Sequence, residues 1–168
     1  MSEAYTVASR RAWKSEELDG LKPTVYDWVR MAAFIDGEGS VQVNPYGKRR
    51  LHQVRILVSN TNAALTNWLL RTFGGNVVLR DHKNPKWKVA YIWSCTAARA
   101  AWILWNCLPW FLMKREQAEL LIELQERKDL TRQGRSLRLP EEERAYRATI
   151  HERVKVLNHK GPDGEVSE

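Results

Sequence analysis

Two carboxylates stand where a predicted helix ends, at a place where their charge needs a partner. The segment 31–40, MAAFIDGEGS, puts Asp36 and Glu38 at the C-terminal end of that helix. Acids there oppose the helix dipole, at a cost of about 0.3 to 1 kcal/mol each. A divalent metal held by carboxylate, backbone carbonyl and water would compensate, and Gly37 and Gly39 would let backbone oxygens approach it. A polar helix cap with glycines explains the same residues equally well.

Two cations form the mirror image of this arrangement. Lys114 and Arg115 open a helix predicted over roughly 114–129. Cations at a helix N-terminus are unfavourable unless an anion joins them, and a phosphate would serve. A metal that generates hydroxide and a cation that stabilises developing charge are the two parts that phosphodiester hydrolysis requires. The sequence therefore points to chemistry on phosphodiesters.

Helix signals surround these residues. A capping box with Thr24 and Asp27 opens a helix over about 25–36, and a double glycine after residue 73 closes another. Thr96 is expected to cap a third, and acids after Pro140 begin the last. The predicted helices cover about 25–36, 62–73, 96–107, 114–129 and 140–157. Trp102, Trp105 and Trp110 are expected to pack in the core.

From Val41 the hydrophobic period changes from helical to alternating, which predicts four strands in two hairpins. One side of these strands is apolar: Val41, Val43, Val54, Ile56, Val58, Val77, Leu79, Val89, Tyr91 and Trp93. The other side is polar and cationic: Gln42, Asn44, Tyr46, Gln53, Arg55, Ser59, Arg80, His82, Lys86 and Lys88. The predicted fold is α+β, with order αββαββα, an antiparallel sheet with helices on one face, and further C-terminal helices. The opposite face is left for a ligand.

The positive charge of the chain is concentrated in its middle. The net charge is +7, but residues 41–94 hold nine lysines and arginines against one acid. The rest of the chain holds 18 bases and 19 acids, so the whole excess lies in this central third, which contains the predicted strands. Such a concentration is typical of a surface that binds a polyanion, and nucleic acid is the expected partner.

The length and composition limit the remaining possibilities. A chain of 168 residues is expected to form one core over 23–130, with an N-terminal arm over 1–22 and a helical extension over 131–168. Cys95 and Cys107 lack metal-ligand spacing and are expected to be structural thiols. The N-terminus has no apolar signal region, and no stretch is apolar enough for a membrane span, so an intracellular protein without a membrane partner is expected.

Several of these segments resemble one protein family. Residues 31–40 resemble the LAGLIDADG motif of homing endonucleases, in its single-copy form. The segment 52–62, HQVRILVSNTN, is similar to the second-strand segment of that family, and 108–118, LPWFLMKREQA, to its active-site lysine segment. The resemblance covers about 25–125. It implies a saddle-shaped αββαββα domain that dimerises through the motif helices and lays its sheet in the DNA major groove.

The resemblance also implies roles for particular residues. Glu38 matches the metal-binding acid and the carbonyl of Gly37 its backbone partner, with Mg²⁺ or Mn²⁺ as the metal. Asn60 falls where the family often has a glutamine near the hydrolytic water, and Lys114 matches a lysine near the scissile phosphate. Asp36 matches an acid of mainly structural role. The expected dimer interface consists of Ala32, Ala33, Asp36 and Gly37. Ala33 replaces a glycine at the helix crossing, and Glu38 replaces the commoner aspartate.

Together these features predict a homodimeric, site-specific double-stranded DNA endonuclease, an intron-encoded meganuclease in the terms of that family, with a pseudo-palindromic target. Amides suit adenine and arginine suits guanine, so base readout is expected from Gln42, Asn44, Gln53, Arg55, Ser59 and Arg80. Phosphate contacts are expected from Lys48, Arg49, Arg50, Lys83, Lys86 and Lys88, and DNA contact also from Tyr46 and His82. The alternatives are a maturase that binds intron RNA and a non-catalytic DNA-binding regulator of the same fold.

Overall fold

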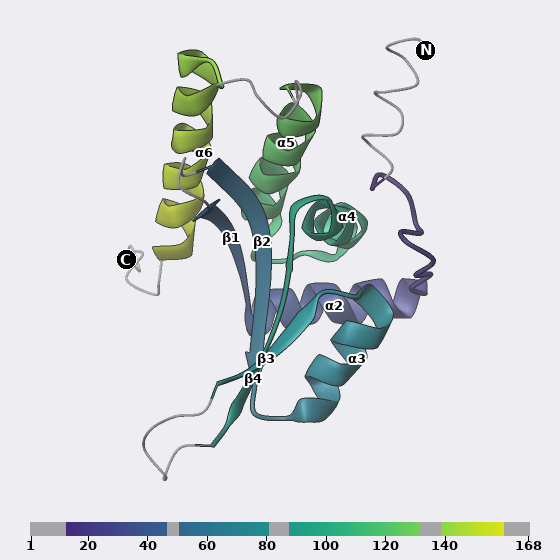
Figure 1. Cartoon of the computed structure of the whole chain (residues 1–168). Helices are drawn as coiled ribbons and strands as arrows, with labels where there is room; N and C mark the ends of the chain where they lie inside the picture. The colour runs from purple at the N-terminus through teal and green to yellow at the C-terminus, as the bar shows by residue number, and fades with distance from the viewer. Residues whose placement is uncertain (1–12, 47–50, 81–87, 132–138, 160–168) are drawn as a thin grey trace, which may run out of the picture.

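The protein is described from a computed structural model, over residues 13–46, 51–80, 88–131 and 139–159 (Figure 1). In chain order its elements are α2 (Val25–Gly37), β1 (Gly39–Tyr46), β2 (Leu51–Asn60), α3 (Ala63–Phe73), β3 (Asn76–Arg80), β4 (Ala90–Thr96), α4 (Ala97–Cys107), the 3₁₀ helix η1 (Leu108–Trp110), α5 (Arg115–Thr131) and α6 (Glu141–His159). This order confirms the predicted α+β arrangement. The short η1 helix is an addition to it.

The four strands form one antiparallel sheet with the order β1-β2-β4-β3. Val41, Ile56 and Trp93 are fully buried beneath the helices, whereas the residues next to them along each strand are only partly buried. Gln42 and Arg55 lie opposite each other on the other face and remain partly exposed. The predicted buried side is therefore confirmed for β1, β2 and most of β4, and the opposite side is mostly polar but includes the apolar Leu57 and Ile92.

The far ends of β3 and β4 depart from that prediction. Leu79 is 63% exposed and Val89 is exposed, although both were expected on the buried side. Figure 1 shows the reason: these strand ends extend beyond the helices, so no second layer covers them. The alternation of apolar and polar residues along a strand predicts which side chains share a face. That face is buried only where a helix packs over it.

Aromatic residues fill the core between the sheet and the helices. The rings of Trp28 and Trp102 meet edge to face with centroids 5.1 Å apart, and Trp28 also contacts Phe73 at 5.2 Å. The Trp102 indole donates to the carbonyl oxygen of Ser15 at 2.9 Å. Trp102 is thus a core residue as predicted. Trp105 and Trp110 were predicted to pack there as well, but they lie at the surface, 39% and 44% exposed.

Local capping explains where the helices begin. The Thr24–Asp27 capping box forms as predicted, with the Thr24 backbone N–H donating to the Asp27 carboxylate at 2.8 Å. Asn62 caps α3 by accepting the N–H of Ala64 at 2.9 Å. Thr96 occupies the predicted cap position of α4, but its side chain makes no capping hydrogen bond. The start of α4 therefore depends on packing more than on its cap.

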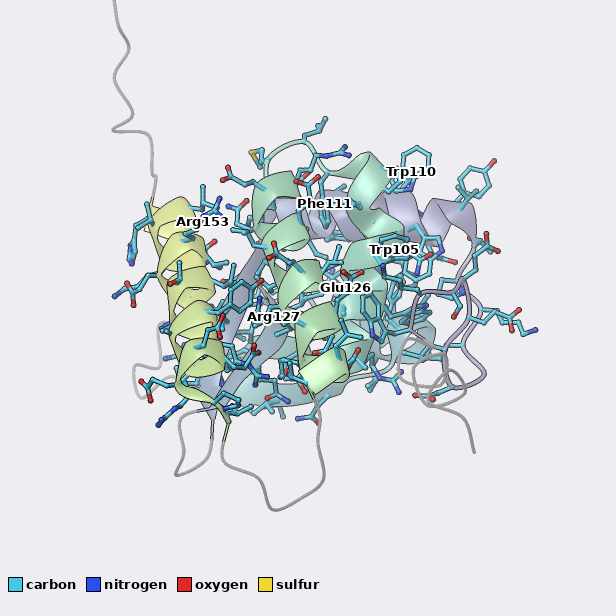
Figure 2. All side chains as sticks on the ribbon, turned by 90° about the horizontal axis from the view of Figure 1, so that it is seen from above. Trp105, Trp110, Phe111, Glu126, Arg127 and Arg153 are labelled. Atoms are coloured by element: carbon cyan, nitrogen blue, oxygen red, sulfur yellow. The ribbon has the colours of Figure 1, made fainter. Side chains whose placement is uncertain are left out.

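The N-terminal segment packs against α5, and α6 packs against α5 and β1. Trp13 is buried and its indole donates to the Asp129 carboxylate at 2.7 Å. Figure 2 shows α5 between α4 and α6. Asn158, near the end of α6, donates its side-chain amide to the carbonyl oxygen of Val41 at 2.9 Å, which ties α6 to the edge strand β1. No helix among the described residues has the length and apolar character needed to cross a membrane.

Candidate functional site

Asp36 connects the end of α2 to the start of α5. One of its carboxylate oxygens accepts the backbone N–H of Leu112 at 2.8 Å, and the other accepts those of Met113 at 3.3 Å and Lys114 at 3.0 Å. The side chain is buried, and it supplies the anion that a helix N-terminus favours. These backbone N–H groups compensate the charge of Asp36 within the chain, so Asp36 itself needs no metal.

Glu38 has a different environment from Asp36. It is exposed at the C-cap of α2, and its Oε2 accepts a hydrogen bond from Nδ2 of Asn60 at 2.6 Å. The amide of Asn60 is itself oriented, because its Oδ1 accepts the backbone N–H of Asn62 at 2.8 Å. One carboxylate oxygen is therefore positioned by the end of β2 while the group still faces solvent.

Lys114 reaches the same place from α5. Its Nζ donates to the carbonyl oxygen of Gly39, the residue that follows Glu38. Burial lowers the pKa of Lys114, and the nearby Asp36 carboxylate acts in the opposite direction. The structure thus brings the three residues expected to be catalytic, Glu38, Asn60 and Lys114, to the junction of α2, β1 and β2.

The glycines around Glu38 have separate explanations. A Cβ at Gly39 would lie 2.6 Å from the Cα of Ile35 and 2.9 Å from its carbonyl oxygen, so only glycine fits between β1 and α2. A Cβ at Gly37 would meet nothing within 4 Å. Glycine inside a helix costs about 0.5 to 1 kcal/mol relative to alanine. The fold of a single chain therefore requires Gly39 to be glycine and gives no reason for Gly37.

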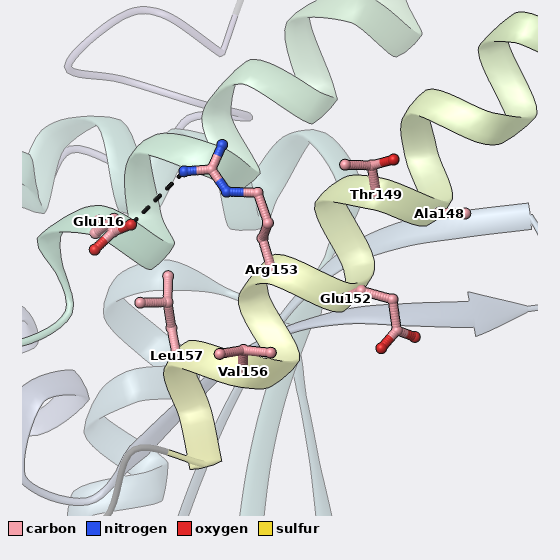
Figure 3. A pocket seen from close by; sticks show the side chains of 7 residues that line it. All are labelled: Glu116, Ala148, Thr149, Glu152, Arg153, Val156 and Leu157. Carbon is pink, nitrogen blue, oxygen red and sulfur yellow. Dashed lines mark ion pairs between the residues drawn. The ribbon is translucent and has the colours of Figure 1, made fainter. Parts of the chain in front are cut away.

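A cavity of about 540 Å³ lies beside the lysine. Its lining comes from β1, the two residues before Arg115, α5 and α6: Gly39, Ser40, Met113, Lys114, Glu116, Gln117, Leu157 and Asn158. The α6 residues were not among the predicted site residues, because nothing in the sequence signals that Leu157 and Asn158 lie near Lys114. A second, more open hollow between α5 and α6 contains the Glu116–Arg153 pair, 3.7 Å apart and largely exposed (Figure 3).

The donor set at this site permits one kind of metal binding. Among the described residues, no group of three or more histidine, cysteine, aspartate or glutamate side chains could hold an ion. Glu38 supplies one exposed carboxylate, beside the backbone of Gly37. Magnesium often binds through one or two carboxylates while water and substrate phosphates complete its shell. The residues fit such a metal if substrate and further ligands from outside the chain complete the site.

The open face of the sheet carries the residues expected to read bases. Gln42 lies opposite Arg55, and Asn44 lies opposite Gln53, so these four form two adjacent cross-strand pairs. Arg80, Ser59 and Lys88 are exposed. The side chain of Tyr46 is not described, and Lys48, Arg49, Arg50, His82, Lys83 and Lys86 lie outside the described residues.

One stripe on the exposed side of α2 is small and apolar, next to the exposed Tyr26 and Arg30. Ala33 and Gly37 lie on it, whereas Ala32 is fully buried and Asp36 points towards α5, both within their own chain. Val25 and Val29 continue the same stripe. Two apolar residues that sequence reasoning missed lie next to the end of α2, because their backbone N–H groups bind Asp36: Leu112, 91% exposed, and Met113.

Comparison with solved structures identifies the fold. The homing endonuclease I-CvuI, in complex with its target in the presence of calcium, matches with TM-score 0.62 at 14% sequence identity, over 82% of this chain and 85% of that chain. I-CvuI with the I-CreI target and magnesium, the DNA not cleaved, matches with TM-score 0.57 at 16% identity, over 85% and 86%. No protein-family profile and no curated protein matches the sequence. The chain has the fold of a homing endonuclease.

Proposed function

We propose that this protein is a site-specific double-stranded DNA endonuclease of the LAGLIDADG type that acts as a homodimer with a divalent metal. The observation that carries the proposal is the meeting of Glu38, Asn60 and Lys114 at one end of a polar, cationic sheet face. An acid bonded to an amide, with a lysine bonded to the next backbone carbonyl, has no evident role in the core. On this fold they match the needs of phosphodiester hydrolysis.

The residues divide the work in the following way. Glu38 would hold Mg²⁺ or Mn²⁺ with the backbone carbonyl of Gly37, and the metal would supply a hydroxide nucleophile and polarise the phosphate. Asn60 orients the Glu38 carboxylate through its 2.6 Å hydrogen bond. Lys114, fixed against the Gly39 carbonyl, stabilises the negative charge that develops on the phosphate. The carboxylate and the lysine thus act on the same phosphate from two elements.

The test of the proposed function uses DNA of unspecified sequence. The protein is incubated with a randomised duplex library and Mg²⁺, and the cut ends are sequenced. We expect ends that share one pseudo-palindromic sequence and disappear when EDTA removes the metal. Cut ends without a common sequence, or cutting that persists in EDTA, would contradict the proposal. Binding to structured RNA without DNA cleavage would favour a maturase, and sequence-specific DNA binding without cleavage would favour a regulator.

Arg55 is expected to determine part of the target sequence. It faces the proposed major-groove side, opposite Gln42, and arginine pairs well with guanine there. We expect Arg55→Ala to relax the preference at one symmetric pair of target positions, by about 1 to 3 kcal/mol for the preferred base. Arg71→Ala, which removes an exposed arginine from α3 on the other side of the sheet, is the control. Profiles of cut sites for both variants check this, and an unchanged Arg55→Ala profile would contradict the orientation of the sheet.

Dimerisation is expected through the exposed side of α2. Gly37 and Ala33 keep this side thin, and no packing within the chain explains the glycine. Ala33→Leu adds bulk outside the chain's own core, and overpacking of a close contact costs about 1 to 3 kcal/mol. We therefore expect wild-type particles of twice 19.6 kDa and a dissociation constant about 5- to 150-fold higher in the variant.

Light scattering across a concentration series measures this equilibrium. Ala145→Leu makes the same change at an exposed position on α6 and is expected to leave the dimer intact. A wild-type monomer at micromolar concentration that still cuts both DNA strands would contradict dimerisation.

A further inference from the structure

The proposed DNA-binding face contains apolar side chains that the amide and arginine contacts leave unexplained. Ile92 on β4 lies directly opposite Val78 on β3 and Ser59 on β2. Leu57 lies two residues from Ser59 on the same strand and therefore on the same face. We call Leu57, Val78 and Ile92 the apolar band. It crosses three of the four strands.

The band is separate from the hydrophobic core. The neighbours of its residues along the strands, Val58 and Trp93, are fully buried on the helix side, whereas the band residues take no part in that core. Val78 is 52% exposed, and Leu57 and Ile92 are partly exposed. A sequence selected only to hold a soluble sheet face would be expected to place polar residues at these positions. The band therefore indicates that a partner molecule binds to this face.

The surroundings of the band indicate a nucleic acid as that partner. Arg80 follows Val78 by two residues and Arg55 precedes Leu57 by two, so cations lie at both ends of the band on the same face. The wider segment 41–94 holds the whole positive excess of the chain. In the major groove one feature is apolar, the C5-methyl group of thymine. Side chains of valine, leucine and isoleucine fit that methyl group and can make no hydrogen bond to a base.

We propose that the apolar band contacts thymine methyl groups in the target and so selects thymine at those positions. This inference rests on the proposed DNA-binding function. The position of the band also predicts where these thymines lie. Ser59, in the row of Ile92 and Val78, precedes Asn60, which holds Glu38. Ser59 lies four residues from Arg55, about 13 Å along the strand. The thymines therefore lie closer to the cleaved phosphate than the base pair contacted by Arg55.

The experiment removes the methyl groups and nothing else. Two randomised duplex libraries are prepared, one with thymidine and one with deoxyuridine in its place. Both are selected for binding without divalent metal and, separately, for cleavage with Mg²⁺. We expect thymine to be enriched at a pair of inner positions in the first library, and uracil to be enriched there about fourfold less per methyl group in the second. The preference attributed to Arg55 is expected to be equal in both libraries.

Two variants test whether the discrimination between thymine and uracil comes from this face of the sheet. Val78→Ser is expected to abolish the difference between thymine and uracil at one symmetric pair of positions. Leu79→Ser, the same kind of change at a more exposed neighbour on the opposite face, is expected to retain it. Equal enrichment of thymine and uracil by the wild-type protein would overturn the proposal, as would a loss of discrimination in Leu79→Ser alone. Sequence-selective DNA binding without cleavage would contradict the proposed endonuclease activity. The proposed thymine selection would still be tested, because the binding selection measures the methyl preference without cleavage. Absence of any sequence-selective binding overturns both.

Discussion

Glu38→Gln is expected to abolish metal-dependent cleavage, by at least three orders of magnitude in single-turnover rate, while DNA affinity changes by less than about threefold. The glutamine can still accept the hydrogen bond from Asn60, so the local structure is kept. What it loses is the negative charge by which a carboxylate attracts Mg²⁺. The variant weakens metal binding and keeps the shape of the site. The cleavage rate is therefore expected to fall while the DNA affinity is retained.

Cleavage rates with Mg²⁺ and affinity without metal are measured for the same target duplex. Glu119→Gln is the matched control, because Glu119 is an exposed carboxylate on α5 that is paired with Arg115 at 3.1 Å. It is expected to cut at the wild-type rate. A Glu38→Gln variant that retains rapid Mg²⁺-dependent cutting would remove Glu38 from the active site and with it the metal assignment.

The extent to which the sequence predicts this fold depends on the range of the contacts involved. Alternation along β1 and β2 and the Thr24–Asp27 capping box are local, and both were predicted correctly. The exposure of Leu79 depends on where the helix layer ends, and the exposure of Trp105 depends on how α4 turns relative to its neighbours. Both exposures depend on contacts between elements, so the hydrophobic periodicity within one element could not predict them.

The same distinction applies to the site. The charge of Asp36 was recognised as unfavourable at its helix end, but the backbone N–H that it accepts from Lys114 joins residues 78 apart and could not be deduced from either helix. The hydrogen bond between Glu38 and Asn60 likewise joins residues 22 apart. The resemblance to a known family indicated both residues, and the structure adds the contact between them. Sequence reasoning therefore proposed which residues carry chemistry, and the contacts between those residues came only from the structure.

Lys114→Met is expected to lower the single-turnover cleavage rate by about 10²- to 10³-fold with little change in DNA affinity. Loss of one group that stabilises developing charge typically has an effect of that size. The backbone N–H of residue 114 still binds Asp36 in the variant, so the start of α5 is retained. Arg115→Met removes the neighbouring cation, which is more than half exposed and paired with Glu119, and is expected to leave the rate nearly unchanged.

The pH dependence of cleavage distinguishes a catalytic lysine from a structural one. Burial lowers the pKa of Lys114 below its ordinary value of 10.5. Only the protonated amine can stabilise charge on the phosphate, so the wild-type rate is expected to fall as the pH rises through this lowered pKa. In Lys114→Met this alkaline fall is expected to be absent, because the variant has no proton to lose at that position. An alkaline fall that persists unchanged in the variant would assign the titration to another group, and an unchanged rate at neutral pH would remove Lys114 from the chemistry.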